Sequence, residues 1–282
     1  MRLRSLLFVP GDRPDRMAKA LDTGADALVL DLEDSVALGA KAGARVAVAD
    51  FVRHSADLRV PLFVRVNPLG GDEIAADIAA LAGVPYAALV LPKAEGRRSI
   101  EALIGLLGDA TRDVRVLPIA TETPAAIFEL GSYREVGAHL VGLSWGAEDL
   151  PAAVGAATSR TDDGAYTAPY ELARSLTLFA AHAAGVCAID TVYPSIRDLD
   201  GLRAYAARAR RDGFTGMLAI HPTQVGIIND AFTPNADDIA KARAVVAAFA
   251  ARPGAGALQL DGKMIDAPHL KQATRLLELI EE

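Results

Sequence analysis

Short apolar segments recur along the chain, and the stretches between them have the spacing of amphipathic helices. The apolar segments are mostly continuous rather than alternating, which is typical of parallel strands buried on both faces. Eight such segments are present, at residues 5–9, 27–32, 62–66, 87–91, 114–120, 140–145, 187–192 and 217–221. Helical spacing is clearest at residues 13–23, 74–82, 100–107, 123–130, 168–184 and 199–211. The pattern predicts an α/β protein with a parallel sheet.

Eight strands that are each followed by a helix favour a closed (β/α)8 barrel, or TIM barrel. An open doubly wound sheet is the alternative, because periodicity does not show closure. We expect a catalytic barrel domain at residues 1–252, a boundary in the segment Arg-Pro-Gly-Ala-Gly at 252–256, and a C-terminal extension at 253–282. The extension contains a possible short strand at 257–260 and a helix at 268–281. The longest gap between strands holds a polar loop at 155–166, which we expect over the mouth of the barrel.

Composition narrows the function classes. The chain has 282 residues, 51% of them hydrophobic, and a net charge of −7. It has no run rich in lysine and arginine, which counts against a nucleic-acid partner. Its longest uncharged stretches, at 175–189 and 213–229, are too short to span a membrane. Cys187 is the single cysteine, so an intrachain disulfide is impossible, and we expect a cytoplasmic protein.

Charged and hydrogen-bonding residues stand at nearly every strand end. In a TIM barrel these positions meet at the carboxyl-terminal face, where the chemistry takes place. The strand ends supply the following residues: Asp12, Arg13, Asp31, Glu33, Asp34, Arg65, Asn67, Lys93, Glu122, Glu148, Asp149, Asp190 and His221. The opposite ends lack this pattern, so the asymmetry indicates a functional mouth.

Several carboxylates in one mouth repel each other unless protons or a cation neutralise them. Asp31 and Glu33 lie two residues apart and therefore point to one face. Glu122 and Asp149 follow the fifth and sixth strands, which are neighbours in the barrel. A hard divalent cation with oxygen ligands fits such a set, and Mg²⁺ typically uses one or two carboxylates. The alternative is that Glu122 and Asp149 cap the helices that follow them.

Basic residues add candidate anion contacts. Arg65 ends an apolar run, where a charge is costly unless it meets an anion. We expect it to grip a substrate carboxylate or oxyanion, or to pair with Glu33 or another acid of the mouth. Lys93 permits a Schiff-base mechanism, but so many acids around it favour an electrostatic role.

The start of the first helix carries three further basic residues, Arg13, Arg16 and Lys19. They are positioned to meet the phosphates of a nucleotide-bearing substrate, or they form an ordinary solvated face.

Taken together, the strand-end motifs resemble the HpcH/HpaI aldolase/citrate lyase superfamily, in its branch similar to the citrate lyase β-subunit. The resemblance runs in order through nearly the whole chain, over the segments LFVPGDRP (7–14), LDLED (30–34), VRVN (64–67), LPK (91–93), ET (122–123), WGAED (145–149) and IHP (220–222). It implies a TIM barrel with Mg²⁺ held at Glu122 and Asp149, and substrate contacts from Arg65 and Glu122. The implied reaction makes or breaks a carbon–carbon bond between an acyl-CoA enolate and a 2-oxoacid.

The C-terminal segment GKMIDAP (262–268), followed by LKQA (270–273), resembles the tail of malyl-CoA and citramalyl-CoA lyases. The resemblance implies that Asp266 is an acid/base that reaches the site of a neighbouring subunit, in a homo-oligomer that is usually a trimer. Lys263 departs from the small residue that relatives often have there.

We therefore expect a Mg²⁺-dependent lyase acting on citramalyl-CoA or malyl-CoA, with Asp266, Arg65 and Glu33 as catalytic residues. Arg65, Glu122, Arg13, Arg16 and Lys19 would bind the substrate. The alternatives are a citrate lyase β-subunit acting on a carrier-bound citryl thioester, a malyl-CoA thioesterase or malate-synthase-like enzyme, a Lys93 Schiff-base aldolase, and a non-catalytic acyl-CoA-binding barrel.

Overall fold

The computed structural model describes residues 1–55, 59–108 and 114–281. These residues divide into two compact units, one spanning Leu3–Phe232 and the other made mainly of the chain from Thr233 onward. Each unit is described by itself.

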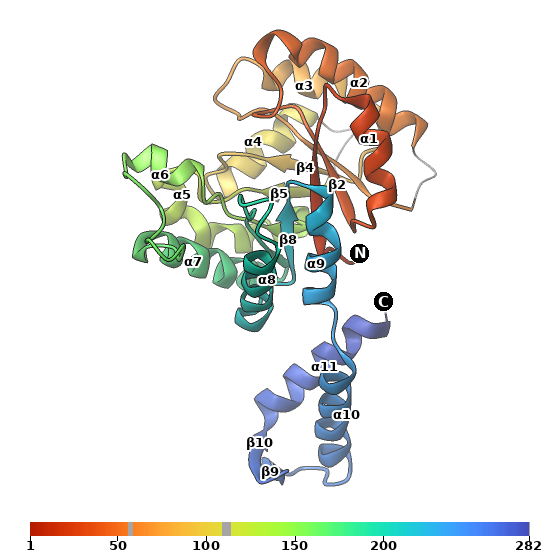
Figure 1. The fold of residues 1–282 in the computed structure, drawn as a ribbon, viewed down its shortest axis with the longest axis vertical. Coiled ribbons are helices and arrows are strands. Elements are labelled where there is room, and N and C mark those ends of the chain that lie inside the picture. The colour runs from red at the N-terminus through yellow and green to blue at the C-terminus, as the bar shows by residue number, and fades with distance from the viewer. Residues whose placement is uncertain (56–58, 109–113, 282) are drawn as a thin grey trace. The chain divides into compact units, whose positions relative to one another are not determined.

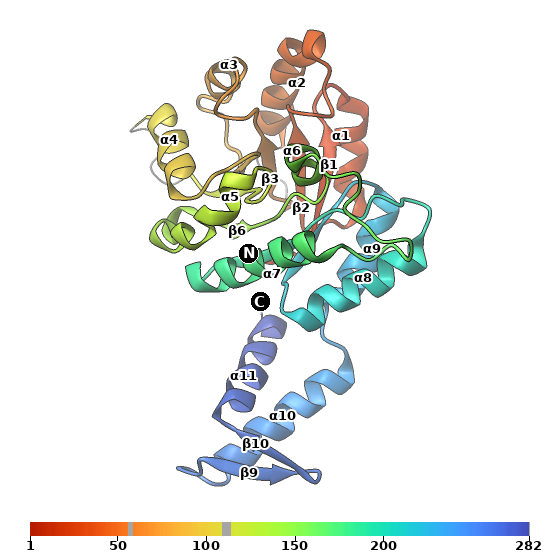
Figure 2. The same ribbon diagram turned by 90° about the vertical axis from the view of Figure 1, so that its left-hand side faces the viewer.

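The larger unit contains eight parallel strands. They are β1 (Ser5–Pro10), β2 (Ala27–Asp31), β3 (Leu62–Arg65), β4 (Ala88–Leu91), β5 (Val116–Pro118), β6 (Gly142–Leu143), β7 (Cys187–Asp190) and β8 (Gly216–Ala219). The helices of this unit are α1 (Pro14–Ala20), α2 (Lys41–His54), α3 (Ile74–Ala80), α4 (Arg97–Leu107), α5 (Pro124–Glu129), α6 (Asp149–Val154), α7 (Ala168–Ala184), α8 (Leu199–Asp212) and α9 (Pro222–Phe232). All eight predicted strands are found, and Figures 1 and 2 show the helices arranged around them.

The sheet closes into a barrel. The strand ladder runs in the order β5-β4-β3-β2-β1-β8-β7-β6. Its two ends are joined by parallel bridges from Val116 to Leu140 and from Ile119 to Ser144. The Ser144 carbonyl accepts the Ala120 N–H at 2.8 Å, which is an ordinary backbone hydrogen bond. The TIM barrel is therefore confirmed, and the open doubly wound sheet is not.

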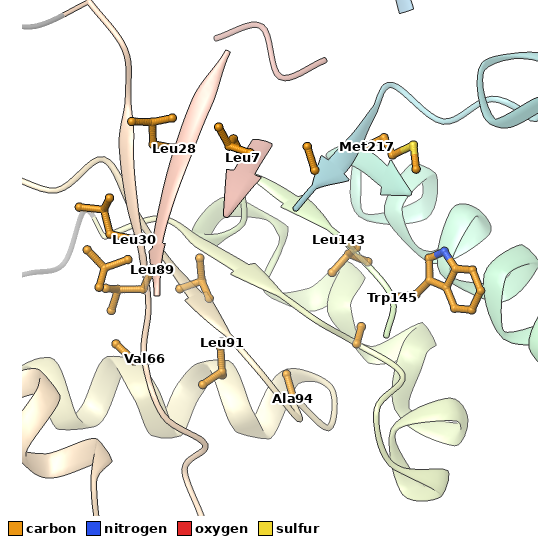
Figure 3. Packing of buried hydrophobic residues seen from close by; sticks show 14 of the residues in the cluster. Leu7, Leu28, Leu30, Val66, Leu89, Leu91, Ala94, Leu143, Trp145 and Met217 are labelled. Atoms are coloured by element: carbon orange, nitrogen blue, oxygen red, sulfur yellow. The ribbon is translucent and has the colours of Figure 1, made fainter. Parts of the chain in front are cut away.

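Two apolar layers explain why the strands are continuously apolar. One layer packs strand residues such as Leu28 and Leu89, which are labelled in Figure 3, together with the helix residues Met17 and Ile100. A second layer contains strand residues and no helix residues, including Val29, which places it inside the barrel. Successive side chains of a strand alternate between these layers, so both faces are buried.

The smaller unit contains α10 (Ala236–Ala250), the antiparallel pair β9 (Ala257–Leu260) and β10 (Lys263–Asp266), and α11 (Ala267–Glu281). Helix α10 packs against α11 and β9. The structure thus divides between Phe232 and Thr233, whereas the sequence places the boundary near residue 252. The difference arises because α10 packs against α11. The local sequence pattern does not show this contact, since the two helices are separated by β9 and β10. No helix among the described residues has both the length and the apolarity needed to cross a membrane.

Candidate active site

A cavity with a volume of about 290 Å³ lies at the carboxyl ends of the barrel strands. Its walls come from strand ends all around the barrel, including Phe8, Asp31, Arg65, Glu122, Trp145, Asp149, Thr191 and Ile220. The inward face of each strand explains their position. Val29 and Phe63 point into the barrel, so Asp31 and Arg65, two residues further along, point to the same side. Five of the polar strand-end residues predicted from the sequence therefore line one cavity: Asp31, Arg65, Glu122, Glu148 and Asp149.

The guanidinium of Arg65 is held in place by the carboxylates of Asp31 and Glu33. Its Nε and Nη2 each donate to Asp31 at 2.6 Å, and its Nη1 lies 2.9 Å from Glu33 Oε2. That last contact is an ion pair without a well-aligned hydrogen bond. Burial opposes the charge on Arg65, but the bond to Asp31 and the charges of Asp31, Glu33 and Asp34 together raise the pKa of the guanidinium above its usual value. Arg65 thus stays cationic, and the anticipated pairing with Glu33 is present.

Asp31, which the sequence placed among the acids of the mouth without a specific role, is the main partner of Arg65. Its side chain is 1% exposed, and it also accepts the backbone N–H of Glu33 and of Ser35. Burial would raise the pKa of Asp31, yet the bonds from Arg65 and these N–H groups lower it. Asp31 therefore positions Arg65 and the chain that carries Glu33. The register pair Asp31–Arg65 on adjacent strands is the signal that identifies this role.

Lys93 lies among three acids. Its Nζ is 2.8 Å from Glu33 Oε1 and 3.4 Å from Asp149 Oδ1, and its backbone N–H donates to Glu122 Oε2 at 2.5 Å. Burial would lower the pKa of the Lys93 amine, but the bond to Glu33 and the charges of all three acids raise it. A permanently protonated amine is a poor nucleophile, so this geometry argues against Schiff-base chemistry. Lys93 also has a φ of 52°, a left-handed conformation that strains a side-chain-bearing residue and often occurs at functional sites.

Glu122 and Asp149 face the same cavity and fit a divalent metal ion. Burial, followed by the charge of Asp149, raises the pKa of Glu122 to about 8. The two carboxylates therefore repel each other, and a cation between them would relieve that repulsion. Among the described residues no cluster of three or more histidine, cysteine or acidic side chains is arranged for a metal. Two carboxylates completed by water or substrate oxygens are a typical Mg²⁺ environment and an unusual zinc environment.

Gly146 allows the loop after β6 to approach Glu122. A Cβ at this position would overlap Glu122 Cγ and would lie 3.1 Å from both Cδ and Oε1. The backbone N–H of Gly146 donates to Thr121 Oγ1 at 3.2 Å, which ties this loop to the end of β5. Glycine is required here because a larger residue would collide with the Glu122 side chain, and not because the backbone adopts a left-handed conformation.

A buried polar cluster supports the wall formed by Trp145. Asp190 is fully buried and accepts from Trp145 Nε1 at 2.6 Å and from Tyr205 at 3.0 Å. Arg174 donates to the other oxygen of Asp190 through Nε at 3.0 Å and Nη2 at 2.8 Å. Tyr166, at the end of the loop predicted over the mouth, packs edge-on against Trp145 at 5.1 Å. Asp190 thus fixes an aromatic wall, a role that the sequence did not reveal.

A second buried cluster fixes the chain around Glu33. Lys41 Nζ donates to the carbonyl oxygens of Leu32 and Glu33 at 2.7 and 2.9 Å, and to Asn67 Oδ1 at 2.7 Å. Asn67 in turn donates to Leu32 and to the buried Asp77. Lys41 lies on α2 and carries no strand-end signal, so sequence patterning does not find it.

The three basic residues expected to meet phosphates lie outside this cavity. Arg13 precedes α1, and Arg16 and Lys19 lie on it; all three side chains are exposed. Arg13 makes an exposed ion pair with Asp15 at 3.5 Å.

Asp266 belongs to the smaller unit, at the end of β10 and directly before α11. Its side chain is 34% exposed and lies against His269. The predicted site residues thus form three groups: Arg65, Glu122 and Asp149, which line the cavity, with Glu33 paired to Arg65; the exposed basic residues near α1; and Asp266.

A parallel-stranded barrel with an acidic, cation-binding mouth defines a class of metal-assisted enzymes. The family model for HpcH/HpaI aldolase/citrate lyase matches residues 4–222, and the chain belongs to this family. It is therefore a carbon–carbon lyase of the type related to the citrate lyase β-subunit, as the strand-end motifs indicated.

Named relatives agree with this assignment. The citrate lyase subunit beta-like protein of Mycobacterium tuberculosis is 38% identical over 276 residues, covering 96% of this chain and 93% of the relative. A (3S)-malyl-CoA thioesterase of Cereibacter sphaeroides is 33% identical over 288 residues, covering 99% and 94%.

The fold is also that of a solved relative. The crystal structure of CitE from Mycobacterium tuberculosis in complex with magnesium, acetoacetate and coenzyme A has a TM-score of 0.85 and 37% identity, covering 100% of this chain and 99% of that one. A second structure from this organism, a citrate lyase β-subunit with oxaloacetate and magnesium, has a TM-score of 0.71 and 39% identity, covering 83% and 98%. The prediction of magnesium is confirmed at the level of the family.

Proposed function

We propose that this protein is a Mg²⁺-dependent lyase that cleaves or forms a 3-hydroxy-3-carboxyacyl-CoA, such as citramalyl-CoA or malyl-CoA. The products of cleavage are an acyl-CoA and a 2-oxoacid. The observation that carries the proposal is the convergence of a fixed guanidinium, Arg65, and two repelling carboxylates, Glu122 and Asp149, in one cavity. A relative that binds magnesium, acetoacetate and coenzyme A supports it.

In this proposal Glu122 and Asp149 hold the metal. When bound, Mg²⁺ supplies Lewis acidity toward the carbonyl and carboxylate oxygens of the 2-oxoacid. The Glu122 carboxyl must lose its proton to become a ligand, because its pKa is raised to about 8. The Lys93 N–H holds one Glu122 oxygen, which leaves the other free to face the cavity.

Arg65 orients the oxoacid fragment and stabilises charge that develops on its oxygens. Two N–H groups of Arg65 are committed to Asp31, so the guanidinium plane is fixed before a substrate arrives. Glu33 contacts both Arg65 and Lys93 and so holds these two cations near each other. Preorganised charges of this kind need no rearrangement during the reaction.

Asp266 is the proposed acid/base, contributed by a neighbouring subunit of a homo-oligomer, which we propose to be a trimer. It would take the hydroxyl proton during cleavage and return a proton to the enolate of the acyl-CoA. Arg13, Arg16 and Lys19 would meet the coenzyme A phosphates as exposed point charges.

The test is release of pyruvate from citramalyl-CoA, or of glyoxylate from malyl-CoA, with Mg²⁺ and with EDTA. Release that stops with EDTA supports the proposal, and the preferred thioester names the substrate. Absence of oxoacid from both thioesters, with products only from a carrier-bound citryl thioester, would instead identify a citrate lyase β-subunit.

A second candidate is thioester hydrolysis, because a relative of similar length is named (3S)-malyl-CoA thioesterase. The two reactions share no product. Cleavage of malyl-CoA gives acetyl-CoA and glyoxylate without free thiol, whereas hydrolysis gives malate and free coenzyme A. A thiol assay run beside the glyoxylate assay separates them.

A further inference from the structure

Asp266 has an immediate partner that the site described so far does not include. His269 lies in the first turn of α11, and its Nδ1 is 2.5 Å from Asp266 Oδ1. The backbone N of Asp266 lies 3.2 Å from the same nitrogen, and its N–H donates there when Nδ1 carries no proton. Both side chains are accessible, with exposed fractions of 34% for Asp266 and 47% for His269.

The close contact between ring and carboxyl requires a proton between them. Either Nδ1–H donates to the carboxylate, or the protonated carboxyl donates to the lone pair of Nδ1. In both states Oδ1 is bonded to the ring. Among the described residues of the smaller unit, no donor reaches Oδ2. The two oxygens of Asp266 are therefore distinct: one is held by the ring, and the other is free to react.

The position of Asp266 in the chain makes such a holder necessary. Asp266 directly precedes a helix, where a carboxylate normally turns back to accept the first free N–H groups of that helix. A carboxylate turned in that way would face its own helix rather than a substrate. In this structure His269 occupies Oδ1 instead, and no described N–H of α11 donates to the Asp266 side chain.

We propose that His269 is a positioning residue for Asp266: it holds Oδ1, keeps the carboxyl from capping α11, and presents Oδ2 for proton transfer. The inference rests on the proposed acid/base role of Asp266. An acid/base that has lost its alignment commonly costs a large part of its contribution, which is about 10²- to 10⁴-fold when intact.

The variants His269→Ala, His269→Gln and Asp266→Asn test the inference, with Gln272→Gly as the matched control. Gln272 is exposed on α11 away from Asp266, and glycine there weakens the helix by about 1 kcal/mol without touching the pair. Each variant is assayed as the full-length protein on citramalyl-CoA and malyl-CoA for kcat and KM, with the Tm recorded.

We expect His269→Ala to lower kcat about 10- to 100-fold with KM within about twofold of the wild type. The Tm should change little, because the released carboxylate can then cap α11. His269→Gln should restore most of kcat, because its amide N–H can donate to Oδ1.

Two results would overturn the positioning role alone. In the first, His269→Ala keeps wild-type kcat while Asp266→Asn is inactive. In the second, Gln272→Gly lowers kcat as much as His269→Ala does. Full activity of Asp266→Asn would overturn the acid/base role itself, and the positioning role with it.

Discussion

The buried carboxyl of Glu122 should make the free energy of unfolding of the metal-free protein fall as the pH rises. The variant Glu122→Gln should lack this contribution. Glu122 is 4% exposed, and burial together with the charge of Asp149 raises its pKa to about 8. In the unfolded chain the same carboxyl titrates near its usual value of about 4.3. Between these two values the folded protein holds a proton that the unfolded chain lacks.

The sign and size follow from this difference in bound protons. Where the folded state binds one more proton, the free energy of unfolding falls by about 1.4 kcal/mol for each unit of rising pH. From pH 5.5 to 7.5 the contribution of Glu122 therefore decreases by about 3 kcal/mol. Glutamine has the same shape and can accept the Lys93 N–H, but it does not titrate in this range. Glu122→Gln should thus gain about 3 kcal/mol relative to the wild type over the same interval.

The assay is urea unfolding in EDTA at pH 5.5, 6.5 and 7.5 for the wild type, Glu122→Gln and the control Glu129→Gln. Glu129 is an exposed acid at the end of α5, so its replacement removes a charge without relieving burial. Only differences between variants are compared, because other groups titrate in all three proteins. A wild-type-minus-Glu122→Gln difference that stays constant across pH would refute the reasoning.

Three further predictions concern the same cavity. Mg²⁺ affinity measured by calorimetry should fall by up to about tenfold per pH unit below about pH 8, because the ion must displace the proton of Glu122; affinity that does not vary between pH 6 and 8 would contradict this. Gly146→Ala should weaken Mg²⁺ binding at least about tenfold, because the added methyl group displaces the Glu122 side chain from its ligand position; Gly105→Ala, on α4 where a Cβ meets no other atom, is the control. Arg65→Lys should lower kcat about 10²- to 10³-fold while the fold is kept, because an ammonium cannot make the two-point contact with Asp31; wild-type turnover in this variant would show that this contact is unnecessary.

The single tryptophan, Trp145, offers a readout for these experiments that does not depend on turnover. It lines the cavity, and its indole N–H is fixed by Asp190. A ligand or metal that enters the cavity should therefore change its fluorescence.

The sequence by itself predicted the eight strands, the helices between them and the face that carries the site, whereas closure into a barrel was decided by the bridges between β5 and β6. Eight continuous apolar runs separated by helical patterns are a local property, since each strand needs both faces buried. The polar strand ends located the mouth for the same reason, because parallel strands all end on one side. The family motifs added Mg²⁺ and the lyase class, which the comparisons then confirmed.

Only the tertiary structure decided which residues act together. Several contacts join strands or helices that lie far apart in sequence: the Arg65–Asp31 pair, the Lys41 and Asp190 clusters, and the approach of Gly146 to Glu122. The raised pKa of Glu122 likewise depends on burial and on the charge of Asp149. The assignment of α10 to the smaller unit depends likewise on its packing against α11. Local patterns record which face of an element is apolar, whereas pairing, distance and burial of charge arise only when the elements meet.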